Sequence, residues 1–396
     1  MRKRGLSFIL SLTALPLIAA GESTDQKIQW KGKIEIEHGV KIMRNPKDSL
    51  FGDLKLELHE DLSIGREDDK NYLFHRIRGI DVDNEGNIFV DDMSNFRIQK
   101  YDRKGKYLQT FGRKGQGPGD FQMPMLARIE NNSGNILVKD YGENLVILNK
   151  QGIYINNIHL GKLIYDFIPN EDETIIAILM TGNMDKKHSL CKINTTGEVL
   201  ATYIEYPYPI YSKTANGMHM MMTTGYELSL YLSEIDQKSI VYGYSKDYEL
   251  NVIDKNGTVL YRIKKGEPAP RYTSEELSDF NKTIKRVPFF EIPRDKPYFY
   301  GIMVDSEARV YVQRNKASVT IRGYGPTDKE GKEVDVFSKE GYYLYKTTLP
   351  PNTCVIKNGF IYAYHLDEEE GLESVRRYRI KNWDEIKTNI KLLSGR

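Results

Sequence analysis

Histidine and acidic side chains are the residues of this chain with the clearest potential for metal chemistry. The seven histidines never occur in the HxH or HExxH spacing that brings two ligands onto one zinc ion. Asp81, Asp166 and Glu227 are expected on or near strands that converge in the fold, where oxygen ligands could hold calcium, but no DxDxDG loop is present. The sequence therefore predicts no metal site and no cofactor. Calcium or zinc bound by residues from distant segments stays open as an alternative.

A nucleophile motif would indicate covalent catalysis, and a glycine-rich loop would indicate phosphate binding. No GxSxG motif occurs, so a serine nucleophile of that kind is not indicated. The segment GRKGQGPGDF (112–121) has the glycines of a phosphate-binding loop, but such a loop leads directly into a helix. Here Pro118, Phe121 and a predicted strand occupy that place, which favours a crossover between two repeats. No catalytic residue is predicted.

A basic cluster is one candidate for ligand binding. His75, Arg76 and Arg78 are expected where a strand enters the centre of the fold. Arginine presents a planar fork of donors, so this entry would favour a carboxylate or another anionic group. Asp166 and Glu227 are the acidic residues that we expect near the same centre.

The segment 206–222 is the second candidate, because it is rich in tyrosine and methionine. Methionine adapts to irregular surfaces, and tyrosine combines an apolar ring with a polar tip. Tyr208, Tyr211 and Met221 are therefore predicted ligand contacts. The same composition equally suits a long loop that packs onto the fold.

A hairpin pattern that recurs five times shows which elements position these residues. In each copy Asp, Asn or Ser follows an apolar or aromatic residue, and Gly comes three residues later. The copies are YDRKGKYL (101–108), LNKQGIYI (148–155), INTTGEVL (193–200), IDKNGTVL (253–260) and FSKEGYYL (337–344). The polar side chain opens a type I turn, and Gly takes the left-handed position that closes it. The first three glycines are about 45 residues apart, which is the length of one four-stranded propeller blade.

These repeats predict an all-β fold, a six-bladed β-propeller of four-stranded antiparallel blades. The blades are expected at 73–112, 123–160, 162–205, 224–264, 298–349 and 352–392. Two inserts interrupt the repeats: 206–224, interpreted as a long loop, and 265–297, with a short helix capped by Thr273 or Ser274.

The N-terminal segment 21–72 precedes the propeller at 73–396. Its residues 54–65 end like 106–112, with an outer strand followed by Gly. We therefore expect this N-terminal strand to join the last blade, which closes the ring and removes an exposed sheet edge.

Residues 73–125 resemble the NHL repeat. The matching features are GIDVDNEGNIFVDD (79–92), then Asn95 and Arg97 before Tyr101, and then GQGPGDF after Gly112. Taken as a chain, 40–383 is similar to the bacterial exported six-bladed β-propeller proteins with NHL-like repeats. The resemblance implies the fold but no catalytic residue, because related propellers serve as scaffolds, nucleic-acid binders, lyases and hydrolases.

Residues 1–20 have the layout of a secretory signal peptide. Arg2, Lys3 and Arg4 precede an apolar run (6–20) that is shorter than a membrane span and ends in small residues. No cysteine lies near the expected cleavage site after Ala20. We therefore expect an exported protein, periplasmic or extracellular, that is not lipid-anchored.

Composition excludes several further classes. Mean hydropathy is −0.53 over 396 residues, which excludes a multi-span membrane protein. Without the three N-terminal cations the chain has 54 basic against 55 acidic residues, a net charge of −1, unlike that of a nucleic-acid binder. Cys191 and Cys354 fall in blades three and six, on opposite sides of the ring, so we predict two free and mostly buried thiols.

The favoured hypothesis is a non-catalytic, monomeric binding module for a protein, peptide or glycan ligand on the ring face that carries the inserts. The alternative is a metal-dependent hydrolase or lyase with ligands at the mouth of the central tunnel. Neither hypothesis includes a nucleic-acid partner or a membrane span.

Overall fold

The computed structural model describes residues 30–182, 186–208, 211–215, 218–222, 227–286, 294–314 and 331–386. One compact unit begins at Lys31. The predicted signal segment 1–20 lies outside the described residues, so its role stays a prediction. Within the described ranges the chain is mostly β-strand.

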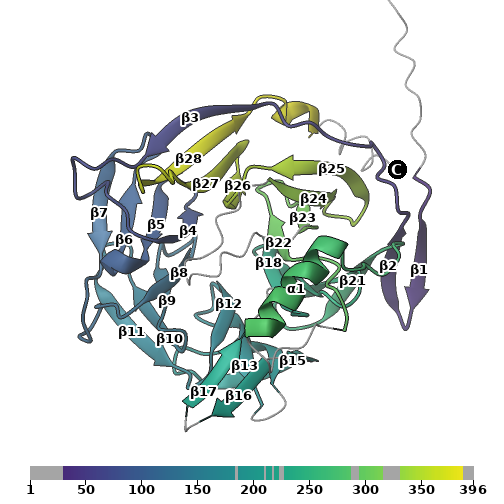
Figure 1. Ribbon diagram of the computed structural model, residues 1–396, viewed down its shortest axis with the longest axis horizontal. Coiled ribbons are helices and arrows are strands. Elements are labelled where there is room, and N and C mark those ends of the chain that lie inside the picture. Colours follow the sequence, from purple (N-terminus) through teal and green to yellow (C-terminus); the bar gives the residue numbers. More distant parts are fainter. Residues whose placement is uncertain are drawn as a thin grey trace, which may run out of the picture. The chain divides into compact units, whose positions relative to one another are not determined.

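Six four-stranded antiparallel blades form a ring, which confirms the predicted fold class (Figure 1). Blade one consists of β4 (Ile77–Val82), β5 (Ile88–Asp92), β6 (Arg97–Tyr101) and β7 (Tyr107–Phe111). Blade two consists of β8 (Pro124–Ile129), β9 (Ile136–Asp140), β10 (Asn144–Leu148) and β11 (Tyr154–His159). Blade three consists of β12 (Ile164–Pro169), β13 (Ile175–Thr181), β14 (Lys187–Ile193) and β15 (Val199–Pro207).

The other three blades follow the same order. Blade four consists of β18 (Leu230–Asp236), β19 (Ser239–Tyr244), β20 (Glu249–Asp254) and β21 (Val259–Lys265). Blade five consists of β22 (Gly301–Val304), β23 (Val310–Gln313), β24 (Lys332–Phe337) and β25 (Tyr343–Leu349). Blade six consists of β26 (Thr353–Lys357), β27 (Phe360–Leu366), β28 (Glu373–Ile380) and the N-terminal strand β3 (Leu58–Ile64).

The five predicted turn glycines all have φ between 80° and 94° and lie between the third and fourth strands of their blades. In the first of these turns, Asp102 Oδ1 accepts the backbone N–H groups of Lys104 (2.8 Å) and Lys106 (2.9 Å). A Cβ on Gly105 would lie 2.8 Å from Leu62 Cδ1 in blade six. Gly105 is thus required by its left-handed backbone and by the close approach of the next blade.

The hydrophobic core lies between neighbouring blades. Because both faces of a blade are covered, its middle strands are buried on both sides, and every residue from Ile175 to Met180 in β13 is buried. Between blades one and two, Phe89 and Phe111 stack at 6.1 Å in a cluster that includes Phe121. Burial on both sides explains why apolar runs, and not strict alternation, mark these strands in the sequence.

The N-terminal segment 33–64, which we call the strap, runs along the outer edges of three blades. Its last strand, β3, pairs antiparallel with β28, as the sequence predicted. Its first two strands, β1 (Lys33–Glu37) and β2 (Val40–Asn45), form a hairpin, and β2 pairs in parallel with β21 of blade four. Between them, Leu50 N–H and Phe51 N–H donate to Tyr343 O and Leu344 O of blade five, at 2.9 Å each. Neither the hairpin nor its attachment to blade four was predicted from the sequence.

The insert 206–224 differs from its prediction as a long loop. β15 continues to Pro207, and β16 (Tyr211–Ala215) pairs antiparallel with β17 (Met218–Met222). The signal that we missed is Asn-Gly at 216–217 between two β-prone runs, a strong sequence pattern for a hairpin.

The second insert contains α1 (Ser274–Arg286), close to its predicted position. Thr273 Oγ1 accepts the N–H of Glu276 at 3.2 Å, and Thr273 N–H donates to Glu276 Oε2 at 2.7 Å. This reciprocal pair is a capping box, and it identifies Thr273 as the cap.

Both cysteines are free thiols, as predicted. Cys191 lies on β14 of blade three and Cys354 on β26 of blade six, and these blades face each other across the ring (Figure 1). Burial raises the pKa of both thiols, that of Cys354 to about 11. Neither thiol is therefore an activated nucleophile at neutral pH.

Candidate functional site

The first strands of the six blades surround the centre of the ring. Because strands alternate in direction, each first strand begins on the face where the fourth strand of the preceding blade ends. Both inserts join a fourth strand to a first strand, so both lie on this face, which we call the insert face. His75 directly precedes β4 and lies on the insert face as well.

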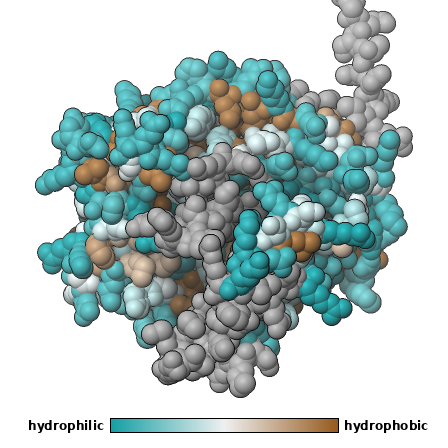
Figure 2. Space-filling model, viewed as in Figure 1, coloured by the Kyte–Doolittle hydropathy of each residue, from teal (hydrophilic) through white to brown (hydrophobic). Residues whose placement is uncertain are grey.

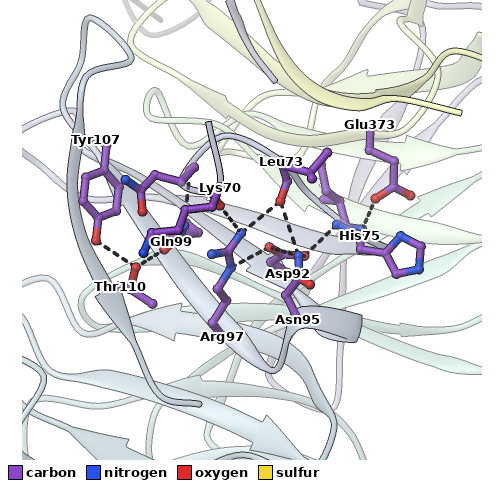
Figure 3. Close-up of polar contacts among 12 residues, drawn as sticks. Lys70, Leu73, His75, Asp92, Asn95, Arg97, Gln99, Tyr107, Thr110 and Glu373 are labelled. Atoms are coloured by element: carbon purple, nitrogen blue, oxygen red, sulfur yellow. Dashed lines mark hydrogen bonds and ion pairs between the residues drawn. The ribbon is translucent and has the colours of Figure 1, made fainter. Parts of the chain in front are cut away.

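A network around Asp92 holds the loop that carries His75 (Figure 3). Asp92 ends β5 and is fully buried. Its carboxylate accepts hydrogen bonds from His75 N–H (2.8 Å), Asn95 Nδ2 (2.9 Å) and Arg97 Nε (2.8 Å). Arg97 Nη2 also donates to Leu73 O at 2.9 Å. Asn95 and Arg97, which carry the resemblance to the NHL repeat, therefore have a structural role here, and they fix the entry to blade one.

Directly after the loop held by the Asp92 network, basic side chains lie near the centre of the ring. Arg76 has φ of 68°, in the left-handed region, which redirects the backbone into β4. Ile77 N–H donates to Glu373 Oε2 of blade six at 2.9 Å. The exposed imidazole of His75 and the half-buried Arg76 and Arg78 thus follow one another on a backbone fixed from two blades.

Arg78 on β4, Arg128 on β8 and Lys139 on β9 form a group that we call the cationic wall. Burial lowers the pKa of Lys139, the charge of Asp166 opposes this, and Arg78 and Arg128 lie near enough to lower the pKa further. Burial likewise lowers the pKa of Arg78, with a smaller contribution from Arg76. Arg78 was predicted from the sequence as a site residue, but Arg128 and Lys139 were not. Their signal was a charged residue within an otherwise apolar strand.

Three aspartates of the tunnel oppose this positive charge. Asp166 Oδ1 accepts a hydrogen bond from Arg128 Nη2 at 3.2 Å, and Asp81 Oδ2 accepts the N–H of Ile129 at 2.8 Å. Asp91 Oδ2 accepts the N–H of Ala127 at 3.0 Å.

Asp91 lies deepest of these carboxyls and is only 1% exposed. A Cβ on Gly79 would lie 2.5 Å from Asp91 Oδ2, so the side chain packs directly against the first strand. Burial raises the pKa of Asp91 to about 7, and the Ala127 N–H and the Arg128 charge offset this only in part. Near neutral pH, Asp91 therefore neutralises the cationic wall only partly.

Arg78 differs from the other two members of the cationic wall. Lys139 Nζ donates to Tyr165 O at 3.2 Å, and Arg128 is paired with Asp166. The guanidinium of Arg78 forms no hydrogen bond or ion pair within the described part of the chain. A guanidinium that is half-buried and uncommitted favours an anionic group arriving from outside.

The part of the insert face at blades three and four is aromatic and closely packed. His188 is sandwiched between Tyr208, stacked at 3.9 Å, and Tyr165, in an edge contact at 4.1 Å. Leu230 N–H donates to His188 Nδ1 at 3.3 Å, and burial lowers the pKa of His188 to about 4, so this imidazole is neutral. Glu227 is buried beside the same tyrosines and contributes to their raised pKa values.

The predicted site residues therefore fall into three groups. His75, Arg76 and Arg78 lie together at the entry to blade one, and Asp166 joins them through Arg128. Tyr208, which is 6% exposed, and Glu227 lie in the packed wall between blades three and four. Tyr211 and Met221 lie on β16 and β17, and their side chains are outside the described part of the structure.

A cavity of about 650 Å³ occupies the tunnel toward the other face of the ring. Asp81, Arg128, Asp166 and Lys357 contribute to its lining. Among the described residues, no group of three or more His, Cys, Asp or Glu side chains is placed to hold a metal ion.

A second cavity, of about 700 Å³, lies between the strap and blades four and five. Its deepest carboxylate, Asp335, accepts hydrogen bonds from Tyr248 OH and Tyr343 OH (2.6 Å each) and from Lys265 Nζ (2.7 Å). At its rim Arg314 Nη2 donates to Glu267 at 2.6 Å. The charged groups that line this cavity most deeply are thus already paired with one another.

Comparison with known proteins agrees with the architecture. A family model described as a 6-bladed beta-propeller matches residues 64–256. No curated protein matches the chain. The chain is thus a six-bladed β-propeller.

Two solved bacterial structures share this fold. One is a member of the duf4221 family from Bacteroides vulgatus, with 17% identity, a TM-score of 0.53, and coverage of 82% of this chain and 98% of that chain. The other is an exported-protein candidate from Bacteroides fragilis, with 13% identity, a TM-score of 0.52, and coverage of 86% and 99%. At these identities the similarity concerns the fold.

Proposed function

We propose that this protein is a non-catalytic, extracytoplasmic binding module that holds an acidic group of a peptide, protein or glycan ligand at the insert face. The observation that carries the proposal is the guanidinium of Arg78, half-buried and without a hydrogen-bond or ion-pair partner in the described residues. Burying a charge without a partner is unfavourable, so such a group is retained where a ligand completes its interactions.

The surroundings of Arg78 support an anionic ligand. Lys139 adds positive charge near Arg78, and Arg128 adds positive charge near Lys139, while Asp91 is partly protonated near neutral pH. A carboxylate placed between Arg78 and Lys139 would form charge-assisted hydrogen bonds, which are about twice as strong as neutral ones. Around the ring, hydrophilic side chains predominate on the face shown in Figure 2, which suits a polar ligand.

Export is the second part of the proposal and rests on the signal-like segment 1–20. Within the described ranges, no helix is long and apolar enough to cross a bilayer. We also infer that the repeats are of the NHL-like type, with the Asp92, Asn95 and Arg97 network as the feature to compare between relatives. The alternative function, a metal-dependent hydrolase or lyase, is favoured by no specific observation in the described residues.

Binding of paired probes tests the ligand class. The acidic probes are an oligogalacturonate and a glutamate-rich peptide, and the neutral counterparts are a glucose oligomer of equal length and the same peptide with glutamine. We expect the acidic probes to bind more tightly, and Arg78→Gln to weaken their binding about tenfold or more, the loss of one charged hydrogen bond.

The matched control is Arg379→Gln, because Arg379 is an exposed arginine on β28, the third strand of blade six, away from the centre of the ring. This variant should bind like the wild type. Equal affinity for acidic and neutral probes, or unchanged binding by Arg78→Gln, would overturn the proposal.

A further inference from the structure

β1 forms an exposed edge of its sheet. β1 is the last strand of the six-stranded sheet β1-β2-β21-β20-β19-β18, and within the described residues no strand pairs with its outer side. In Figure 1 it lies at the periphery, beyond β2. Ile34 and Ile36 on this strand are 49% and 68% exposed. An exposed edge with apolar side chains is a template for pairing with another strand.

The hairpin geometry determines which backbone groups face outward. His38 and Gly39 form a two-residue turn with φ values of 51° and 81°, the left-handed combination of a type I′ hairpin. Glu37 and Val40 beside this turn form a hydrogen-bonded pair, and hydrogen-bonded pairs alternate along the strand. The N–H and C=O groups of Lys33 and Glu35 thus face β2. Those of Ile34 and Ile36 face the free edge.

The charges along this strand are complementary to those of a second copy of itself. Lys31, Lys33, Glu35 and Glu37 alternate with Gly32, Ile34 and Ile36, so the four charges share one face. In an antiparallel pair centred on Ile34, Lys33 lies opposite Glu35 of the second copy, and Lys31 lies opposite Glu37. On the other face, Ile34 meets Ile34 and Ile36 meets Gly32.

The alternative register, centred on Glu35, is less favourable. It places Glu35 directly opposite Glu35 of the second copy, and like charges in that position destabilise a sheet. Within one chain Lys33 Nζ lies 2.5 Å from Glu35, and Arg44 bonds to both Glu35 and Glu37, so the charged face is already ordered. Such exposed pairs contribute little energy each, and their effect is to select the register.

We propose that two copies of this chain form a symmetric dimer by antiparallel pairing of β1, centred on Ile34. The partner strand contributes the hydrogen bonds that the free edge lacks, and the contact closes around a two-fold axis. The dimer replaces the monomer that we expected from the sequence. It is independent of the ligand proposed above, since β1 lies on the outer edge of blade four.

The molar mass in solution tests the proposal directly, by sedimentation from low to high micromolar concentration. We expect the wild type to reach twice the chain mass of 45.8 kDa, less any segment removed on export. Ile34→Pro removes an N–H that faces outward and has no partner among the described residues, so it should give a monomer whose melting temperature matches the wild type. A wild type that stays monomeric at the highest concentration would overturn the proposal.

Cysteine cross-linking tests the register. In the proposed pair, Ile34→Cys places two thiols on directly opposite residues, about 5.5 Å apart at Cα, within disulfide range. Ile36→Cys is the matched control, because its two copies would be about 13 Å apart along the strands. The unmodified chain, with Cys191 and Cys354, gives the background. A covalent dimer through Glu35→Cys, or none through Ile34→Cys, would overturn the register.

Discussion

Two buried aspartates, Asp335 between blades four and five and Asp91 between blades one and two, have opposite pKa shifts. They are 2% and 1% exposed, so their loss of hydration is similar. Burial alone would raise the pKa of Asp335, but the charges of Lys265 and Arg314 outweigh it and the pKa is lowered. Burial raises the pKa of Asp91 to about 7, because one backbone N–H and the charge of Arg128, which is paired with Asp166, compensate only in part.

The difference separates a structural charge cluster from one available to a ligand. Around Asp335 two tyrosine hydroxyls and Lys265 satisfy the carboxylate, and Lys265 also lies 4.4 Å from the centre of the Tyr343 ring. The cations that act on Asp91 are Arg128 and Lys139, which have Asp166 and Tyr165 O as their own partners. Arg78, which lies near Lys139, has no side-chain partner in the described residues. Three substitutions test this contrast.

The largest effect is expected for Asp335→Ala. The substitution leaves the ammonium of Lys265, 2% exposed, with Glu267 at 3.2 Å as its remaining carboxylate. Breaking a buried ion pair from one side costs about 3–5 kcal/mol of unfolding free energy. Urea denaturation should show this loss. Glu340→Ala, at an exposed carboxyl in the following turn, is the control and should change stability by less than about 0.5 kcal/mol. Similar values for both variants would show that the cluster does not stabilise the fold.

Asp91 should give the second largest effect, as a dependence of stability on pH. A carboxyl whose pKa rises from 3.8 to about 7 on folding favours the protonated folded state. Stability from this group is therefore greatest at low pH and falls as pH rises through 7, by about 2.5 kcal/mol between about pH 5 and 8. Asp335, with a lowered pKa, has the opposite sign, and its contribution is lost as pH falls.

The comparison of Asp91→Asn with the wild type isolates the pH-dependent contribution of this carboxyl to stability. Asparagine keeps an oxygen for the Ala127 N–H but does not titrate, so the fall in stability between pH 5 and 8 should be smaller in the variant. Glu340→Gln should retain the wild-type pH profile. Parallel profiles for Asp91→Asn and the wild type would mean that Asp91 is charged throughout this range.

The sequence predicted the ring because its signals are local. Each of the five turns needs only a polar residue and Gly105 or its counterpart three positions later, and the spacing of the turns sets the blade length. Closure by β3 was predictable because 54–65 resembles an outer strand. The attachment of the β1–β2 hairpin to blade four was not, since the parallel pairing of β2 with β21 joins residues more than two hundred positions apart. The hairpin itself had a local signal that we missed, the alternation of charged and apolar residues before His38 and Gly39.

The candidate site could be predicted only in part. His75, Arg76 and Arg78 are consecutive or nearly so, and the start of an inner strand places them together. Arg128 and Lys139 belong to the same group only because blade two packs against blade one. Tyr208 was selected by composition, which cannot distinguish a surface ring from one stacked on His188.

The smallest effect is expected for Arg78→Met, and it tests whether the cationic wall is maintained for a ligand or for the fold. Burial lowers the pKa of Arg78, so the folded protein disfavours its charge. Methionine keeps most of the apolar volume without that charge, and we expect a gain of about 0.5 kcal/mol in unfolding free energy, together with weaker binding of the acidic probes. Arg379→Met should change neither quantity. A loss of stability above about 1 kcal/mol in Arg78→Met would instead assign Arg78 to the fold, because removing an uncommitted charge cannot cost that much.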